Sequence, residues 1–250
     1  VELSGGDIVG LGANYHSYTV NEPYGVVGII LPWNAPINQA GRGIAPALAV
    51  GNTVVVKPSE FTSVSMLLLA QAATESAGLP QGVINVVTGT GPEVGAALVA
   101  HHGVALVSAT GSTAMGAKVA PVVAARFARS ILELGGNNAA IVAPSADIEL
   151  VVRGMTFAAA GTAGQRCTTL RRAIVHRSRL DEVVQRMDSA YASLPVGDPL
   201  QAGTLVGPLI TTTALQRMTA ALDAARTEGG AVVQGGQRIF EQEAPDAAYV

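Results

Sequence analysis

The chain has 250 residues and a formal net charge of −3 at pH 7, and 49% of its residues are hydrophobic and 13% charged. A chain of this length buries a core large enough to fold without a disulfide or a metal, and its small negative charge without basic runs argues against a nucleic acid or an anionic membrane as its partner. Its apolar runs are too short to cross a membrane, and its four histidines lack the spacing of metal ligands, so we expect no metal site.

Short β-branched runs alternate with longer helical stretches from residue 25 onward. The first five expected strands are residues 25–30, 52–57, 83–88, 105–110 and 130–135. The helices expected between them are residues 37–50, 62–78, 92–101 and 112–126. This alternation predicts an α/β fold with an open parallel sheet that carries helices on both faces.

The alternation continues after a glycine pair within residues 134–138, where we expect a change of domain. The later strands are expected at residues 139–143, 171–176 and 231–236, and the later helices at residues 147–161, 180–194 and 212–228. Either Asp147 or Ser145 stands where it can cap the first of these helices. Ahead of the first strand, the segment NYHSYTV (14–20) is also strand-like.

Two glycine-rich segments come close to phosphate-binding motifs and depart from both. GSTAMGAK (111–118) has Ala117 where a P-loop requires lysine, so we reject a P-loop. GTGPEVG (89–95) has the spacing G-x-G-x-x-x-G, which is one residue longer than the dinucleotide fingerprint. By itself this segment is an ordinary strand-to-helix turn.

Cys167, the single cysteine, stands in the segment GTAGQRCTTLRR (161–172). One cysteine cannot form an internal disulfide, which fits a reducing, cytoplasmic compartment. A lone cysteine is often a buried structural residue. Here it follows a helix in a loop rich in Gly and Thr, and neighbouring arginines can stabilise a thiolate. The segment therefore also fits a reactive thiol.

Glu133 lies upstream in the glycine-bracketed segment LELGGNN (132–138), where it ends a strand. A glutamate in so apolar a segment is expected to need a partner. A thiol nucleophile with a carboxylate base is a known pairing in covalent catalysis. Cys167 and Glu133 are therefore candidates for such a pair.

Four blocks in a fixed order, LPWNAP, VVVKPSE, LELGGNNA and FAAAGTAGQRC, resemble the aldehyde dehydrogenase superfamily. The resemblance runs from about Tyr15 to the C-terminus. In the second half, GTAGQRCTTLRRAIVH and GTLVGPL are similar to the branch that oxidises aminoadipate semialdehyde or piperideine-6-carboxylate. In the first half, LPWNAPINQAGRGIAPAL is similar to broad-specificity members instead. The resemblance thus implies oxidation of an aldehyde and leaves open which aldehyde.

The resemblance also implies the domain plan. Residues 1–24 would contain a helix end and a strand of a bridging hairpin, residues 25–134 the NAD-binding domain, and residues 135–250 the first part of the catalytic domain. Enzymes of the family are close to twice this length, and both ends of this chain look cut, so we expect a fragment. A homodimer or homotetramer is implied for the full-length protein.

Three catalytic roles follow from the resemblance. Cys167 resembles the nucleophile, whose thiolate attacks the aldehyde carbon and later carries a thioester. Asn34 resembles the side-chain donor to the oxyanion, together with the Cys167 N–H. Glu133 resembles the general base for hydrolysis. Taken by itself, Asn34 is a turn residue before Pro36.

The cofactor site implied by the resemblance is an NAD site. Lys57 and Glu60 would bind the adenosine ribose, and Glu60 would repel the 2′-phosphate of NADP. Ser112 would receive a phosphate at a helix start. The remaining residues implied are Ile30, Pro32, Trp33, Ser59, Gly91, Gly95, Leu134 and Gly135. The plainer alternatives are a solvated loop at KPSE, a simple N-cap at Ser112 and a core tryptophan at Trp33.

Other readings of the chain remain open. One is a catalytically silent fragment or pseudoenzyme that binds nucleotide or acts through assembly. Another ends the reaction with coenzyme A instead of water, and Glu133 argues against it because a hydrolytic base is retained. Arg166 is either an exposed charge or a group that attracts a substrate carboxylate. Ala109, where the wider family has phenylalanine, implies a roomier pocket near the nicotinamide.

Overall fold

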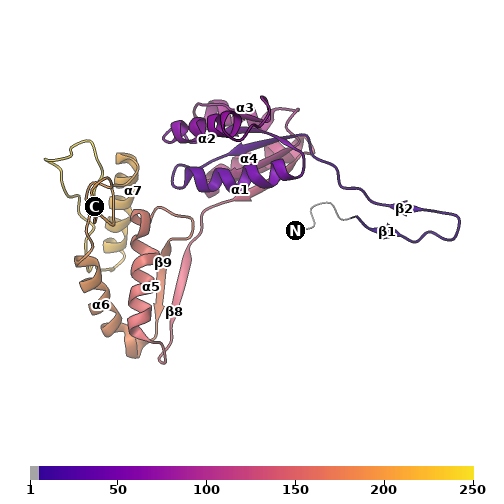
Figure 1. Ribbon diagram of the computed structural model, residues 1–250. Coiled ribbons are helices and arrows are strands. Elements are labelled where there is room, and N and C mark those ends of the chain that lie inside the picture. The colour runs from indigo at the N-terminus through magenta and orange to yellow at the C-terminus, as the bar shows by residue number, and fades with distance from the viewer. Residues whose placement is uncertain (1–5) are drawn as a thin grey trace. The chain divides into compact units, whose positions relative to one another are not determined.

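The computed structural model describes residues 6–250, and residues 1–5 lie outside the described part (Figure 1). The chain divides into two compact units, Val1–Gly135 and Gly136–Val250. Each unit has its own parallel sheet, and each is described by itself below.

The first unit is built on a five-stranded sheet. Its strands are β3 (Val26–Ile30), β4 (Thr53–Lys57), β5 (Ile84–Val86), β6 (Leu106–Thr110) and β7 (Arg129–Glu133). They lie in the order β5-β4-β3-β6-β7, and every pair is parallel. The open parallel sheet expected from the sequence is confirmed.

Helices cover both faces of this sheet. They are α1 (Pro36–Ala49), α2 (Ser63–Glu75), α3 (Ala96–Ala100) and α4 (Thr113–Ala125). Side chains alternate between the faces, so Val54 and Val56 of β4 pack with α1 and α2. Val55, between them, packs against the cluster formed with α3 and α4. The β-branched runs are apolar throughout because both faces are buried.

The order of the strands reverses at one point in this sheet, beside β3. The first strand, β3, lies in the centre, with β4 on one side and β6 on the other. In open α/β sheets, ligands bind outside the carboxyl ends of the strands at such a switch point. The loops that follow β3 and β6 are therefore placed to form a binding crevice.

The helix expected at 92–101 is divided in two. Gly91–Gly95 forms a π-helical turn, and α3 begins only at Ala96. The N–H groups of Val94 and Gly95 both donate to the Thr90 carbonyl, at 3.1 and 3.2 Å, which widens the turn. Pro92 fits there because a proline in the first turn has no N–H that needs a partner.

The N-terminal segment forms a short ribbon. β1 (Ile8–Val9) pairs with β2 (Ser17–Tyr18) in antiparallel fashion. Only part of the strand-like segment 14–20 is thus a strand. We also expected a helix end within residues 1–24. Residues 6–24 contain no helix, and residues 1–5 lie outside the described residues.

The second unit combines a two-stranded sheet with helices. The elements are β8 (Asn138–Val142), α5 (Ile148–Ala160), β9 (Leu170–Val175), α6 (Leu180–Ala192) and α7 (Thr212–Thr227), with short 3-10 helices at Gly161–Gly164 and Arg177–Arg179. Asp147 is the cap of α5, since its side chain accepts a hydrogen bond from Leu150 N. Val142, Val152 and Val183 belong to the core that joins β8, α5 and α6.

The strand expected at residues 231–236 was wrong. This segment has no regular structure, and Val233 is 58% exposed. Gly235 and Gly236 have φ of 68° and 79°, which an extended strand cannot contain. A β-branched run forms a strand only where a partner strand and a packed face receive it.

Within residues 6–250, no helix combines the length and apolar character that crossing a membrane requires.

The Met66→Ala substitution tests the packing of α2 on the sheet. Met66 is 1% exposed, so we expect its truncation to lower the free energy of unfolding by about 2–5 kcal/mol, because a cavity remains. Leu68→Ala, on the same helix at 60% exposure, is the matched control and should change it by less than about 0.5 kcal/mol. Denaturant unfolding measures both. Equal effects would contradict the packing described.

Candidate active site

The residues that the sequence assigns to the cofactor share one edge of the first sheet. Each lies at, or follows, the carboxyl end of a strand: Ile30, Pro32 and Trp33 at β3, Lys57, Ser59 and Glu60 at β4, Gly91 and Gly95 after β5, Ser112 after β6, and Leu134 and Gly135 after β7. The register aligns Ile30 with both Lys57 and Ala109. Parallel strands end at the same edge, so these loops are neighbours.

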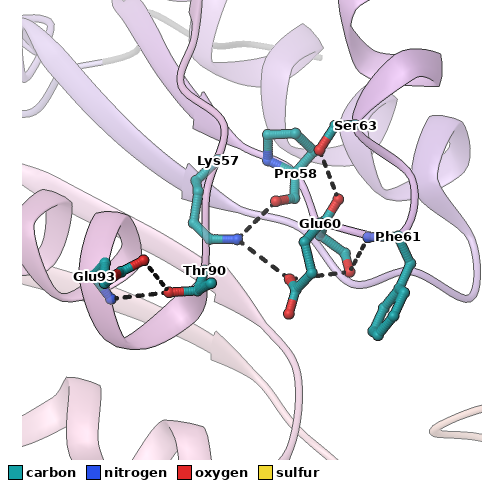
Figure 2. Close-up of polar contacts among 8 residues, drawn as sticks. Lys57, Pro58, Glu60, Phe61, Ser63, Thr90 and Glu93 are labelled. Atoms are coloured by element: carbon teal, nitrogen blue, oxygen red, sulfur yellow. Dashed lines mark hydrogen bonds and ion pairs between the residues drawn. The ribbon is translucent and has the colours of Figure 1, made fainter. Parts of the chain in front are cut away.

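Lys57 is the most buried charged group at this edge. Its side chain is 3% exposed, and its Nζ donates to the Pro58 carbonyl at 2.7 Å and lies 3.8 Å from Glu60 Oε2 (Figure 2). Burial lowers the pKa of Lys57 below its usual 10.5, and the Glu60 carboxylate opposes that effect. KPSE is thus a partly buried loop in which two opposite charges face each other.

Ser59 organises the loop between β4 and α2. Its Oγ accepts a hydrogen bond from Phe61 N at 3.4 Å and lies 3.5 Å from Glu60 Oε2. Its carbonyl accepts from Ser63 Oγ at 3.0 Å. The Ser59 side chain is therefore engaged within its own turn and holds Glu60 beside Lys57.

Thr90 and Glu93 hold the turn that contains Gly91. Thr90 Oγ1 donates to Glu93 Oε2 at 2.8 Å and accepts from Glu93 N at 3.4 Å (Figure 2). This is a variant of the capping box, in which the first residue and the fourth stabilise each other. The T-x-x-E spacing was available in the sequence as a signal for it.

Ser112 and Trp33 resolve two of the plainer alternatives. Ser112 is the N-cap of α4, because its Oγ accepts from Met115 N at 3.1 Å. Capping and phosphate binding at a helix start are compatible. Trp33 is only partly buried, so it is not a core tryptophan.

Asn34 and Pro36 lie in the connection from β3 to α1. Asn34 is partly buried, and Pro36 is the first residue of the helix. Proline is favoured at that position, where its ring sets the helical φ. The loop between the central strand and α1 is therefore short and stiff, and Asn34 is held at the switch point of the sheet.

Glu133 is the last residue of β7, opposite Thr110 of β6. Its carbonyl accepts from Gly111 N at 3.0 Å, and its side chain is exposed. It lines a cavity of about 290 Å³, together with Ser108 and Ile131. Within the first unit, the face of β6 and β7 that carries this carboxylate is open.

Cys167 lies in a loop of strained backbone in the second unit, and it is exposed. Thr162, Ala163 and Gly164 have φ of 58°, 51° and 70°, all in the left-handed region. That conformation costs a residue with a Cβ roughly 1–2 kcal/mol. The exposed thiol and the strained approach to it are unlike a buried structural cysteine, and strain of this kind persists only where surrounding contacts impose it.

Several side chains fix this loop. Arg166 N donates to the Oγ1 of the buried Thr169 at 3.0 Å, and Thr169 N donates to the Arg166 carbonyl at 3.1 Å. Gln165 reaches residues 208–210, where its Oε1 accepts from Ile210 N at 2.9 Å. Asn138 Nδ2 donates to the Cys167 and Thr169 carbonyls.

These anchoring residues, Asn138, Gln165 and Thr169, were missed at the level of sequence. All three lie inside the quoted segments LELGGNN and GTAGQRCTTLRR, and their place in these segments was the one available signal.

Arg166 is directed at its own unit. Its guanidinium donates to the Phe157 carbonyl at 3.2 Å, and its Cζ lies 5.2 Å from the centre of the Phe157 ring. Cations over an aromatic face are attracted by the ring. The Arg166 side chain is therefore held by Phe157 and is not a free surface charge. It connects the end of α5 to the loop of Cys167.

Of the three catalytic candidates, Asn34 and Glu133 belong to the first unit and Cys167 to the second. Within residues 6–250, no group of three or more His, Cys, Asp or Glu side chains is arranged to hold a metal ion.

The chain is similar in sequence to known dehydrogenases along nearly its whole length. The sequence model of the aldehyde dehydrogenase family matches residues 2–250. The alpha-aminoadipic semialdehyde dehydrogenase of Bos taurus is 44% identical over 218 residues, which are 86% of this chain and 40% of that protein. The chloroplastic betaine aldehyde dehydrogenase of Beta vulgaris is 39% identical over 224 residues, or 90% of this chain and 45% of that protein.

The fold is similar to solved structures as well. A variant of aldehyde dehydrogenase C from Pseudomonas syringae, solved with NAD+ and octanal, superposes with a TM-score of 0.86 at 40% identity. The match covers 92% of this chain and 47% of that one. This similarity confirms the expected α/β fold. The chain spans about half the length of the relatives it matches.

Lys57→Met tests the burial of the ammonium group. Because the pKa of folded Lys57 lies below its usual 10.5, the unfolded state binds more protons in the window between the two values. The free energy of unfolding of the parent chain, relative to Lys57→Met, should therefore rise with pH through that window and level off above it. Unfolding titrations at several pH values measure this difference.

Lys118→Met removes an exposed lysine from α4 and controls for the loss of one positive charge. A parent-minus-variant difference for Lys57 that falls with rising pH would contradict a lowered pKa.

Proposed function

The chain belongs to the aldehyde dehydrogenase family, and from this premise we propose that its protein oxidises an aldehyde to the carboxylic acid with NAD. The observation that carries the proposal is Cys167, an exposed thiol on a strained and anchored loop in a chain that the family's sequence model matches over residues 2–250. The proposal concerns the full-length protein.

Cys167 is the proposed nucleophile. Its thiolate attacks the aldehyde carbon, which forms the carbon–sulfur bond and leaves a negative oxygen. That oxygen requires donors placed in advance, and removal of one such donor typically costs 10²–10³ in rate. We assign the donor roles to the Asn34 side chain and the Cys167 N–H. Bound NAD would supply the acceptor for the hydride that leaves this carbon, and loss of the hydride as the C=O bond re-forms would leave a thioester on Cys167.

Glu133 is the proposed base for hydrolysis. Its side chain is exposed at the end of β7, where water can reach it, and a carboxylate can accept a proton from water. The hydroxide equivalent so formed attacks the thioester carbon and releases the acid and the Cys167 thiol. A carboxylate retained for this step favours water over coenzyme A as the final acceptor.

The chemistry of the carboxyl edge fits a dinucleotide. Lys57 and Glu60 supply one cation and one carboxylate, and a ribose hydroxyl can accept from the first and donate to the second. A Cβ on Gly91 would meet open space, which leaves room for a flat adenine ring at that position, and a Cβ on the buried Gly95 would contact Lys57 Cδ at 3.5 Å. Ser112, at the start of α4, is placed to bind a phosphate.

The remaining residues of the proposed site complete that edge. They are Ile30, Pro32, Trp33, Ser59, Leu134 and Gly135. We propose that they line the cofactor, with Trp33 beside the pyrophosphate.

We also propose a homodimer or homotetramer for the full-length protein. β1 and β2 pair over two residues each, and Ile8 and Tyr18 are 79% and 60% exposed. A two-stranded ribbon is marginal in water by itself, and apolar side chains on it favour a partner surface. The single cysteine supports a cytoplasmic setting. Among the relatives, the betaine aldehyde dehydrogenase of Beta vulgaris is named chloroplastic and an aminoaldehyde dehydrogenase of Pisum sativum peroxisomal.

Cys167→Ala tests the reaction directly. Incubation of the full-length gene product with NAD and a panel that contains aminoadipate semialdehyde, betaine aldehyde and octanal should produce NADH absorbance. The variant should lose at least about 10³-fold of that turnover, because the nucleophile is gone. Its thermal shift with NAD should persist, since the proposed cofactor residues lie in the first unit.

Three results would overturn the proposal in different ways. Full turnover by Cys167→Ala would refute the mechanism. An NAD-dependent thermal shift without turnover on any aldehyde would favour a protein that only binds nucleotide. Turnover that depends on added coenzyme A would make water the wrong acceptor.

Glu60→Gln tests the choice of cofactor. The parent enzyme should prefer NAD over NADP, because the Glu60 carboxylate repels a 2′-phosphate. The neutral variant should improve kcat/KM for NADP by about 10-fold, equivalent to roughly 1.4 kcal/mol. Steady-state kinetics with both cofactors measure the ratio. Glu93→Gln, which changes a carboxylate on the neighbouring turn, is the control and should leave the ratio within about two-fold.

A further inference from the structure

Asn138 makes two hydrogen bonds to the backbone around Cys167. It is the first residue of β8, and its Nδ2 donates to the Cys167 carbonyl at 2.8 Å and to the Thr169 carbonyl at 2.9 Å. A side-chain amide has two N–H donors on one nitrogen. One planar group therefore serves two carbonyls on either side of Thr168.

The pairing of β8 with β9 is irregular at Asn138, where a side chain makes the hydrogen bonds in place of the backbone. Asn138 aligns with Leu170, but Ala139 aligns with Arg172, so the register shifts by one residue between them. A bulge of this kind interrupts the backbone ladder. The Asn138 amide thus supplies hydrogen bonds just where the ladder ends and the segment of Cys167 begins.

Two neighbours support the Asn138 side chain. Arg172 donates from Nε and Nη2 to the Asn137 carbonyl, at 3.2 and 2.7 Å, and so holds the preceding peptide. Gly136 has no side chain, and a Cβ there would lie 3.1 Å from Asn138 Oδ1 and 3.5 Å from the Cys167 carbonyl. The space that glycine leaves lets the amide approach that carbonyl.

The Cys167 backbone is therefore held from both sides. The Asn138 amide holds the carbonyl of Cys167, and the paired contacts between Arg166 and Thr169 close the turn around it. Within residues 6–250, the Cys167 N–H donates to no protein group. That N–H shares its peptide plane with the Arg166 carbonyl, which accepts from Thr169 N, so the closed turn sets its direction.

We infer that Asn138 is a positioning residue for the reaction: by holding the Cys167 and Thr169 carbonyls it keeps the turn from Arg166 to Thr169 in place, so that the Cys167 N–H points where the oxyanion forms. This inference rests on the function proposed above. Asn138 acts through the Cys167 backbone and touches neither substrate nor cofactor in this role. Preorganised donors cost no rearrangement as charge develops, whereas a donor on a loose loop must first be ordered.

Asn138→Ala in the full-length protein tests the inference, and Asn85→Ala is the matched control. Asn85, in β5 of the first unit, also donates from Nδ2 to two backbone carbonyls, those of Gly82 at 2.8 Å and Val54 at 3.2 Å. Both variants lose the same number and kind of hydrogen bonds. Only Asn138→Ala should lower kcat for aldehyde oxidation, by about 10–100-fold, with KM for NAD changed less than about two-fold.

Hydrogen exchange gives a second readout that does not depend on turnover. Thr169 N donates to the Arg166 carbonyl, so its amide exchange should accelerate in Asn138→Ala and stay unchanged in Asn85→Ala. Asn138→Ser, which retains one donor, should give intermediate kcat and exchange, and it replaces the alanine variant if that protein does not fold.

The two proposals fail in distinguishable ways. An Asn138→Ala enzyme with kcat within two-fold of the parent, or with unchanged exchange at Thr169, refutes the positioning role and leaves the dehydrogenase function intact. A protein that turns over no aldehyde refutes the proposed function, and accelerated exchange at Thr169 would then support only the anchoring of the loop. Equal losses of kcat in the Asn138 and Asn85 variants would reduce Asn138 to general stability and so overturn the inference.

Discussion

The parallel pairing of β3 with β4 on one side and β6 on the other is the constraint on which the first unit depends. Parallel strands need a crossover between them, and the crossovers here are α1 to α4, which pack on both faces of the sheet. The backbone N–H and C=O groups of the strands bond to neighbouring strands, so the groups available to a ligand lie in the loops. All five strands end at one edge, so residues as distant in sequence as Ile30 and Glu133 belong to the same rim.

The second unit positions its key residue by other means. Its sheet has only β8 and β9, and the ladder between them is interrupted before it reaches Cys167. Side chains take over there: Asn138 holds two carbonyls and Thr169 closes the turn. Thr162 and Ala163 lie in the left-handed region, and the Thr162 carbonyl accepts hydrogen bonds from Gln165 N and Gln165 Nε2, the kind of surrounding interaction that offsets such strain. The first unit thus contributes the loops at the carboxyl edge of its sheet. The second contributes a thiol whose loop is held by side-chain hydrogen bonds.

Most of the fold could be predicted because its signals are local. The apolar runs of β3, β4 and β6 have the composition of strands buried on both faces, and Asp147 and Ser112 cap the helices expected after them. The prediction failed where an element depends on a distant partner. Val232 and Val233 are β-branched yet form no strand, since no neighbouring strand receives them and glycines with positive φ follow. The exposure of Glu133 could not be predicted for a similar reason, because which sheet face lies open is not a local property.

The sequence by itself determined the order of strands and helices, the family and the candidates Cys167, Glu133 and Asn34, because periodicity and motifs are written in consecutive residues. Only the tertiary structure decided that Cys167 is exposed, that Arg166 lies over Phe157 and that Lys57 is buried beside Glu60. The same holds for Asn138, which lies 29 residues before Cys167 and meets its carbonyl only because β8 and β9 pair. Hydrogen bonds and burial depend on distances in space, which spacing along the chain does not specify.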